Sequence, residues 1–254
     1  TVPTGTLPTD IEYWKQVIIN PGFNASTLGN LKFDVRPPVD SVNKGLQLRK
    51  LFGAKRMVFL AASTREGEEK QILAAVKGID ALAPNFLTII VPRHPQRFDA
   101  VADLVQAQGL TLVRRSDWSE QPRAEEHSQS KAVVLGDSLG EMALYYSLAD
   151  VALLGGSFAP LGGQNLIEAA ACGCPVVMGP HTFNFAQISE DAVLAGAARR
   201  VDDAEDLFAQ AAQLLAFDPL RAQMGSAALA FAAREQGATQ RTVAILSPMI
   251  QVLV

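Results

Sequence analysis

Residues 155–185 read GGSFAPLGGQNLIEAAACGCPVVMGPHTFNF. Two glycine pairs precede an Asn165-x-x-Glu168 helix start, and a short apolar strand follows the helix. Glycines let the backbone approach a ligand closely, and the amides that begin a helix favour an anion. Asn165 and Glu168 alone would also suit a capping box that needs no ligand. The run as a whole predicts a ligand-binding loop between a strand and a helix.

The same alternation of short apolar runs and amphipathic stretches continues on both sides of this loop. The apolar runs are Met57–Ala61, Leu87–Val91, Leu110–Val113, Ala132–Leu135, Val151–Leu154 and Pro175–Met178. Helical patterns occupy Glu66–Ile79, Phe98–Ala107, Glu141–Leu148 and Leu166–Ala171. Strands that are apolar throughout are covered on both faces, and parallel neighbours need a long crossover. The sequence therefore predicts an α/β protein with a doubly wound, Rossmann-like parallel sheet.

One motif recurs where three of these strands end. Ser63-x-x-Glu66, Ser138-x-x-Glu141 and Asn165-x-x-Glu168 each follow an apolar run and precede a helical pattern. Such signals predict helix N-termini at the carboxyl ends of strands. Ligands of open α/β sheets bind along that edge, so we expect the site there.

The remaining segments carry weaker signals. Beyond Val201 the chain is predicted to be helical, over Asp203–Phe217, Leu220–Glu235 and Thr239–Val254, with Pro248 interrupting the last helix. Residues 116–130 are polar and read as an exposed loop in which His127 is solvated.

Composition sets limits on function. The 254 residues are 48% hydrophobic and 19% charged, with a net charge of −4, which indicates a globular chain and argues against nucleic acid as a partner. We see no apolar run of about 18 residues and no export signal, and we expect a soluble chain. Cys172 and Cys174 lie two apart, which predicts core thiols in a reducing compartment rather than a metal site.

Five motifs, taken in order, resemble one family. They are GNLKFD at 29–34, AASTREGEE at 61–69, VPRHPQRF at 91–98, LGDSLGEMALYY at 135–146 and the 155–185 run. Together they resemble the donor-binding half of the lipid A Kdo transferases, over roughly residues 28–254. Those enzymes transfer 3-deoxy-manno-octulosonic acid (Kdo) from CMP-Kdo to a lipid A precursor during lipopolysaccharide biosynthesis. The family is inverting and metal-independent and has the GT-B arrangement of two Rossmann-like domains.

The resemblance also implies what this chain does not contain. The family's amino-terminal acceptor domain, with its membrane anchor and proposed general-base glutamate, has no counterpart here, and residues 1–27 form an atypical segment. We therefore expect residues 28–254 to be a donor domain that has no catalytic residue of its own and is inactive alone. The lipid A precursor and the cytoplasmic face of the bacterial inner membrane would be reached through the full-length protein. No Asp-x-Asp motif occurs, and we expect no metal or cofactor beyond the substrate CMP-Kdo and its product CMP.

Two side chains are the principal candidates for donor contacts. Arg93 directly follows a predicted strand, and its planar guanidinium suits a phosphate or carboxylate. Pro92 and Pro95 flank Arg93-His94 and would stiffen this loop. The resemblance implies that Glu168 accepts hydrogen bonds from the ribose hydroxyls.

The other candidates come from the same loops. Asn165 would fix the turn or reach the nucleotide, and the backbone of Gly140, Glu141 and Met142 would border cytidine and phosphate, although Glu141 could be a pure capping residue. Ser63 and Thr64 would bind the sugar carboxylate through hydroxyls or amides. The remaining positions would supply amides: Gly155, Gly156, Ser157, Gly162 and Gly163. His181 could line the cleft.

Two other readings keep the same fold. The Asn-x-x-Glu helix start also suits a UDP-sugar transferase or epimerase of the GT-B type. A lone nucleotide-binding domain could also be a non-catalytic, partner-binding module. NAD binding is less favoured, because no G-x-G-x-x-G follows the first strand.

Overall fold

The structure is a computed structural model that describes residues 30–53, 55–82, 86–118 and 132–251. The predictions for residues 1–27 and for His127 lie outside the described residues. By its contacts the chain divides into two compact units. The larger is Val35–Gln236, and the smaller includes the described residues 30–34 and 237–251.

The larger unit is built on a parallel sheet of seven strands in the order β3-β4-β2-β1-β5-β6-β7. The strands are β1 Val58–Thr64, β2 Leu87–Pro92, β3 Thr111–Arg114, β4 Ala132–Leu135, β5 Val151–Leu154, β6 Val176–Met178 and β7 Ala198–Arg200. All six predicted strands are confirmed, as is the doubly wound parallel sheet. The seventh strand was not predicted; it has three residues, two of them arginines, and pairs with β6 alone.

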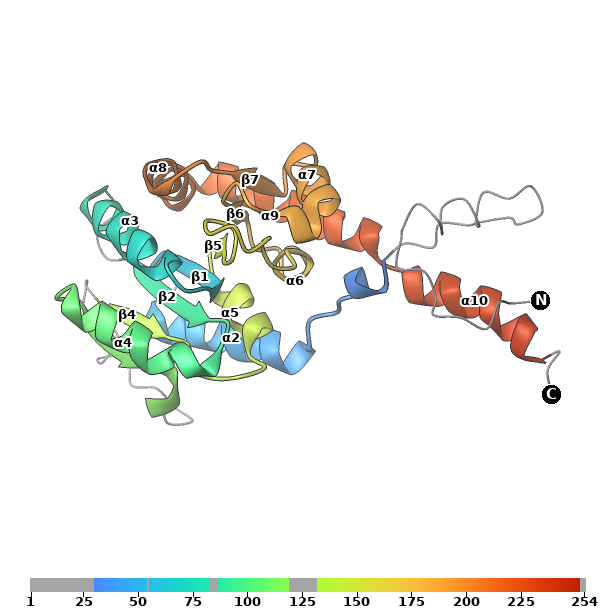
Figure 1. Ribbon diagram of the computed structural model, residues 1–254, viewed down its shortest axis with the longest axis horizontal. Helices are drawn as coiled ribbons and strands as arrows, with labels where there is room; N and C mark the ends of the chain where they lie inside the picture. Colours follow the sequence, from blue (N-terminus) through green and yellow to red (C-terminus); the bar gives the residue numbers. More distant parts are fainter. Residues whose placement is uncertain (1–29, 54, 83–85, 119–131, 252–254) are drawn as a thin grey trace, which may run out of the picture. The chain divides into compact units, whose positions relative to one another are not determined.

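Helices cover both faces of this sheet (Figure 1). One layer contains α3 Glu68–Leu82, α4 Phe98–Ala107 and α8 Ala204–Ala216, and the other contains α2 Val39–Phe52, α5 Met142–Leu148 and α6 Ile167–Ala171. The helix α9 Asp218–Glu235 packs against α6 and α8, and α7 Ala186–Leu194 packs against β7. Helices α2 and α7 were not predicted. Short 3-10 turns occur at η1 Leu31–Phe33, η2 Pro95–Arg97, η3 Arg115–Asp117 and η5 Phe183–Phe185.

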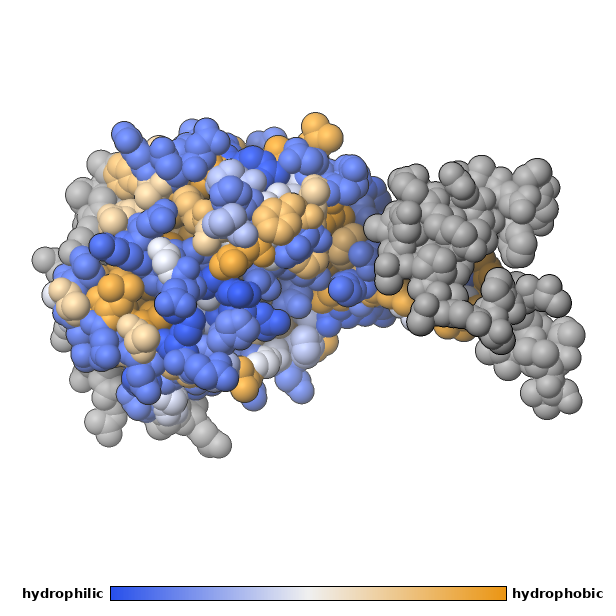
Figure 2. Space-filling model, viewed as in Figure 1, coloured by the Kyte–Doolittle hydropathy of each residue, from blue (hydrophilic) through white to orange (hydrophobic). Residues whose placement is uncertain are grey.

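The core explains why the strands are apolar throughout. In β1, Phe59 and Ala61 belong to the cluster that packs under α3 and α8, while Val58, Leu60 and Ala62 are equally buried. The face of the larger unit in Figure 2 is mostly hydrophilic, with small separate apolar patches. None of the described helices is both long enough and apolar enough to cross a membrane. Cys172 and Cys174 are free thiols, and burial raises the pKa of both.

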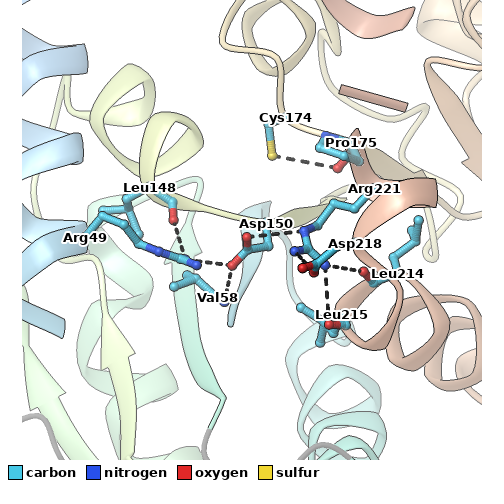
Figure 3. A network of polar contacts seen from close by, with 10 residues as sticks. All are labelled: Arg49, Val58, Leu148, Asp150, Cys174, Pro175, Leu214, Leu215, Asp218 and Arg221. Atoms are coloured by element: carbon cyan, nitrogen blue, oxygen red, sulfur yellow. Dashed lines mark hydrogen bonds and ion pairs between the residues drawn. The ribbon is translucent and has the colours of Figure 1, made fainter. Parts of the chain in front are cut away.

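A polar network fixes the edge of the sheet where the strands begin (Figure 3). The Asp150 carboxylate, just before β5, accepts a hydrogen bond from the amide of Val58, the first residue of β1, at 2.7 Å. The guanidinium of Arg49 in α2 lies 2.6 Å from it, and that of Arg221 in α9 lies 3.4 Å away. Arg49 also donates to the carbonyl of Leu148. Asp150 thus joins two adjacent strands and two helices.

The smaller unit contains α10 Ala238–Gln251, which continues past Pro248, so the interruption predicted there is wrong. The Asp34 carboxylate accepts hydrogen bonds from the amides of Gly237 and Thr239 where this helix begins. Bonds from the hydroxyl and amide of Thr239 lower the pKa of Asp34 to about 2. An ionised cap of this kind complements the unpaired amides of a helix start.

Candidate functional site

The strand order has a switch point between β1 and β5. Strand β2 lies on one side of β1, followed by β4 and β3. Strand β5, which follows β4 in sequence, lies on the other side of β1. Ligands of open α/β sheets bind outside such a switch point. Three segments meet at this edge: residues 63–67 at the end of β1, 93–97 after β2 and 155–166 after β5.

Ser63 has an unusual backbone conformation at the centre of this edge. Its φ is 55°, the one positive value among the described residues other than glycine, and the β1–β2 register shifts there. A Cβ on Gly155 would lie 2.2 Å from the Ser63 carbonyl oxygen, so only glycine fits beside this bulge. Left-handed conformations of residues other than glycine store strain, and such strain clusters at functional sites.

Arg93 and Glu168 lie within electrostatic reach of each other on this edge. The Arg93 amide donates to the Thr64 carbonyl at 3.0 Å, which fixes the loop after β2 to the end of β1. The Arg93 residue is exposed, and within the described part of the chain its guanidinium has no hydrogen bond or ion pair. Glu168 lies in the first turn of α6. Desolvation raises the pKa of Glu168, and the attraction of Arg93 partly opposes that rise. The two side chains therefore lie on the edge where the sequence placed the site, and their contacts with a donor stay a prediction.

The glycine loop differs from the prediction. The amides of Gly155 and Gly163 donate to carbonyls within the protein at 2.8 Å, and that of Gly156 donates to the Glu68 carboxylate at 2.7 Å. The expectation that these three glycines offer free amides to the donor is therefore wrong in this conformation. Their role is conformational, because φ at Gly156 and Gly163 is 69° and 73°. Gly162 has a φ of 85°, and its own amide donates to no described residue.

Three other candidates are buried. Ser157 is fully buried, and its hydroxyl donates to Leu154 and accepts from the Gly179 amide, while the contact predicted for its own amide stays a prediction. Thr64 is also fully buried, and its hydroxyl donates to Glu69 at 3.0 Å, so the predicted hydroxyl contact with the sugar is wrong, and the alternative contact through its amide stays a prediction. Pro92 is buried as the last residue of β2. These residues shape the edge from within.

The loop before α5 is also internally bonded. Glu141 accepts from the Arg115 guanidinium at 2.8 Å and from the Ser138 hydroxyl. The motif predicted that Ser138 would cap the helix amides. Its hydroxyl instead bonds the Glu141 carboxylate. Gly140 has φ 76° and open space beside it, and α5 begins at Met142. The backbone contact predicted for Gly140, Glu141 and Met142 stays a prediction.

The capping motifs predicted where the helices begin better than they predicted which side chains cap them. A helix begins within or just after each of the three motifs, and the Asn165 side chain accepts from the Ile167 amide at 3.1 Å, which confirms its turn-fixing role. Ser63 caps nothing, because α3 begins only at Glu68. His94 is exposed, whereas His181 is half-buried and donates its amide to Ser157.

Sequence reasoning missed Glu68 and Glu69, which are each only 1% exposed. Their run, EGEE at 66–69, indicated the start of a helix and gave no sign of burial. A buried carboxylate requires hydrogen-bonding partners, and those partners come from loops distant in sequence.

A cavity of about 520 Å³ lies away from this edge, among α7, β7, α8 and α9. Its walls include Val193, Leu220 and Met224. Both of its arginines are already bonded, Arg199 to Gln210 and Gln213 at 2.6 and 2.7 Å and Arg200 to Glu190 at 2.5 Å. The described residues contain no cluster of three or more His, Cys, Asp or Glu suited to a metal. Metal independence itself stays a prediction.

Known proteins resemble this chain in sequence and in fold. The family model "Glycosyl transferases group 1" matches residues 54–231. The 3-deoxy-D-manno-octulosonic acid transferase of Bordetella pertussis is 48% identical over 226 residues, which are 87% of this chain and 51% of that protein. The corresponding transferase of Haemophilus influenzae is 36% identical, over 88% of this chain and 51% of that protein.

A solved structure covers the same region. The C-terminal CMP-Kdo binding domain of WaaA from Acinetobacter baumannii superposes with a TM-score of 0.69 at 32% identity, over 76% of this chain and 98% of that domain. The chain therefore belongs to the group 1 glycosyltransferases. Among them it is a member of the family of 3-deoxy-D-manno-octulosonic acid transferases, which confirms the resemblance found in the motifs. The chain spans about half the length of the two transferases it matches.

Proposed function

We propose that this chain binds CMP-Kdo and serves as the donor half of a glycosyltransferase that moves Kdo to a lipid A precursor. The observation that carries the proposal is the pairing of an exposed cation, Arg93, with a carboxylate, Glu168, across the carboxyl edge of the sheet. CMP-Kdo presents a phosphate and vicinal ribose hydroxyls, which need these two kinds of partner. The names of the related transferases and the solved CMP-Kdo binding domain support the same assignment.

Each side chain has a role that suits its chemistry. Arg93 binds the phosphate through its guanidinium fork and stabilises the charge that develops there as CMP departs. Glu168 accepts hydrogen bonds from the ribose hydroxyls. The hydroxyl of Ser63, which has no partner within the described residues, donates to the carboxylate of the sugar.

The reaction we propose is a direct displacement at the anomeric carbon, with inversion. The acceptor oxygen forms its bond to that carbon while the bond to the phosphate oxygen breaks and CMP leaves. The acceptor proton goes to a base in the other half of the enzyme, because the described candidates here all serve the donor. We propose that no metal ion takes part and that the parent protein acts at the cytoplasmic face of the inner membrane.

Calorimetric titration of the chain with CMP tests the assignment. We expect CMP to bind equally with magnesium and with a chelator, and to bind more tightly than UMP. A chain that binds UDP but gives no heat with millimolar CMP would belong to a UDP-sugar enzyme. A magnesium requirement would contradict metal independence.

A transfer assay separates donor binding from catalysis. We expect this chain alone to show no Kdo transfer to a lipid A precursor, while the parent enzyme transfers Kdo. Robust transfer by the chain alone would contradict the division of labour between the two halves.

A further inference from the structure

Glu68, in the first turn of α3, is a buried carboxylate that binds the glycine loop. One of its oxygens accepts from the amides of Arg65 at 2.9 Å and Gly156 at 2.7 Å. The other accepts from Phe158 at 2.9 Å and Ala159 at 3.4 Å. Three of these four amides belong to the loop after β5, about 90 residues away in sequence.

Glu69, the next residue, binds the other side of the site. It accepts from the Thr64 hydroxyl at 3.0 Å and from the Arg97 guanidinium, also at 3.0 Å. Arg97 ends η2, the turn that directly follows Arg93 and His94. Glu69 therefore connects the end of β1 to the loop that carries Arg93.

Burial makes these contacts informative. A carboxylate removed from water is strongly unfavourable unless its oxygens are fully hydrogen-bonded. Apolar side chains at the same positions would pack without that requirement, so the two acids serve something other than core burial. What they share is that each bonds a loop at the carboxyl edge, and together they hold the loops on both sides of Ser63.

We propose that Glu68 and Glu69 are positioning residues that hold the glycine loop and the Arg93 loop in the shape that accepts the donor. This proposal rests on the proposed function. Loops that are already ordered lose less conformational entropy when the ligand binds, so preorganisation appears as affinity. Neither carboxylate touches the donor, because both are enclosed by their own loops.

Glutamine discriminates charge from shape at position 68. The Glu68→Gln side chain has almost the same volume, but its NH2 group would face either the Arg65 and Gly156 amides or the Phe158 and Ala159 amides. One pair of donors would then meet another donor and lose its bonds. In Glu69→Gln the NH2 group can face the Thr64 hydroxyl, which can also accept, while the carbonyl oxygen still accepts from Arg97, so the loss is smaller.

The experiment measures CMP affinity together with amide hydrogen exchange. We expect Glu68→Gln to weaken CMP binding at least about tenfold and Glu69→Gln about threefold, each in protein shown to be folded by its melting transition. Exchange at Gly156 and Phe158 should accelerate in Glu68→Gln and stay slow in Glu69→Gln. Glu190→Gln is the matched control, because Glu190 lies in α7, outside the three segments that meet at the carboxyl edge, and its side chain is 60% exposed and paired with Arg200.

The outcomes separate this proposal from the proposed function. Folded Glu68→Gln protein that binds CMP as well as the unaltered chain would overturn the positioning role and leave the function intact. An unaltered chain that does not bind CMP would overturn the function. Rapid exchange at Gly156 and Phe158 in the unaltered chain would overturn the positioning role even if Glu68→Gln failed to fold.

Discussion

The two edges of the sheet differ in whether their charged groups are bonded within the protein. Where the strands begin, Asp150 is enclosed by Arg49, Arg221 and a backbone amide, so each charge meets its opposite (Figure 3). Where the strands end, Arg93 is exposed without a bonded partner in the described part of the chain, and Ser63 keeps a strained backbone. The comparison indicates that one edge is built for stability, and that the other holds unsatisfied groups ready for a ligand.

The largest expected effect is a loss of stability when the polar network around Asp150 is removed. Asp150→Ala removes the partner of two guanidiniums and of the Val58 amide, and leaves them partly buried. We expect the free energy of unfolding to fall by about 2 to 3 kcal/mol. Urea titration measures this, with Asp103→Ala, on the exposed side of α4, as the control. A loss no greater than that of the control would contradict the role of the network.

The next effect is on binding. Arg93→Ala should weaken CMP binding about 30-fold, or about 2 kcal/mol, because a charge-assisted bond to phosphate is lost. The melting temperature should hardly change, because the guanidinium bonds no described residue. Calorimetry measures the affinity and thermal melting measures the melting temperature. The control is Arg234→Ala, because Arg234 is 59% exposed. Unchanged affinity in Arg93→Ala would remove the phosphate contact from the account.

Glu168→Gln should weaken CMP binding about tenfold at neutral pH, because an amide is a poorer acceptor for two hydroxyls. The loss should shrink with 2′-deoxy-CMP, which lacks one of those hydroxyls. An equal loss with both nucleotides would contradict the ribose contact.

The pKa of Glu168 gives this prediction a pH dependence. Desolvation raises the pKa of Glu168 in the folded protein. The protonated carboxyl therefore contributes stability at a pH below the pKa of the unfolded chain. That contribution is lost as the pH rises through the pKa of the folded protein. Nucleotide binding needs the ionised form, so CMP affinity should rise over the same range. The dependence should disappear in Glu168→Gln, and its persistence there would assign it to another group.

The smallest effect concerns the strain at Ser63. Ser63→Gly should raise the free energy of unfolding by about 0.5 to 1 kcal/mol, since glycine adopts a φ of 55° freely and only part of that gain is offset by its flexibility when unfolded. Ser63→Ala is the comparison, because it removes the hydroxyl and keeps the strain. Equal stability of the two variants would show that the backbone is not strained.

The sequence was a good guide to the sheet because its signal is local. Runs of four or more apolar residues identified six strands, whereas β7, with two arginines, exists only through its pairing with β6. Helix α2 was missed although it has 14 residues. Its Gly45, which weakens a helical pattern, is needed because a Cβ would lie 2.5 Å from the Leu144 carbonyl of α5.

The site was predictable only where the chemistry follows a strand directly. Arg93 and Glu168 were placed on the carboxyl edge because a strand end and a helix start fix their positions there. The amides of Gly155 and Gly156 were misjudged, because their availability depends on distant acceptors. Gly156 bonds Glu68, which is 88 residues away, and no local pattern predicts such a contact.

The most direct test of the central claim is a titration with CMP followed by the backbone amide NMR signals of the chain. The account predicts that the largest changes fall on residues 63–67, 93–97 and 165–168, at the ends of β1, β2 and β5. Signals around Asp150, and around Arg199 and Met224 in the separate cavity, should stay unchanged. Changes concentrated at either of those places, with the carboxyl edge silent, would contradict the account.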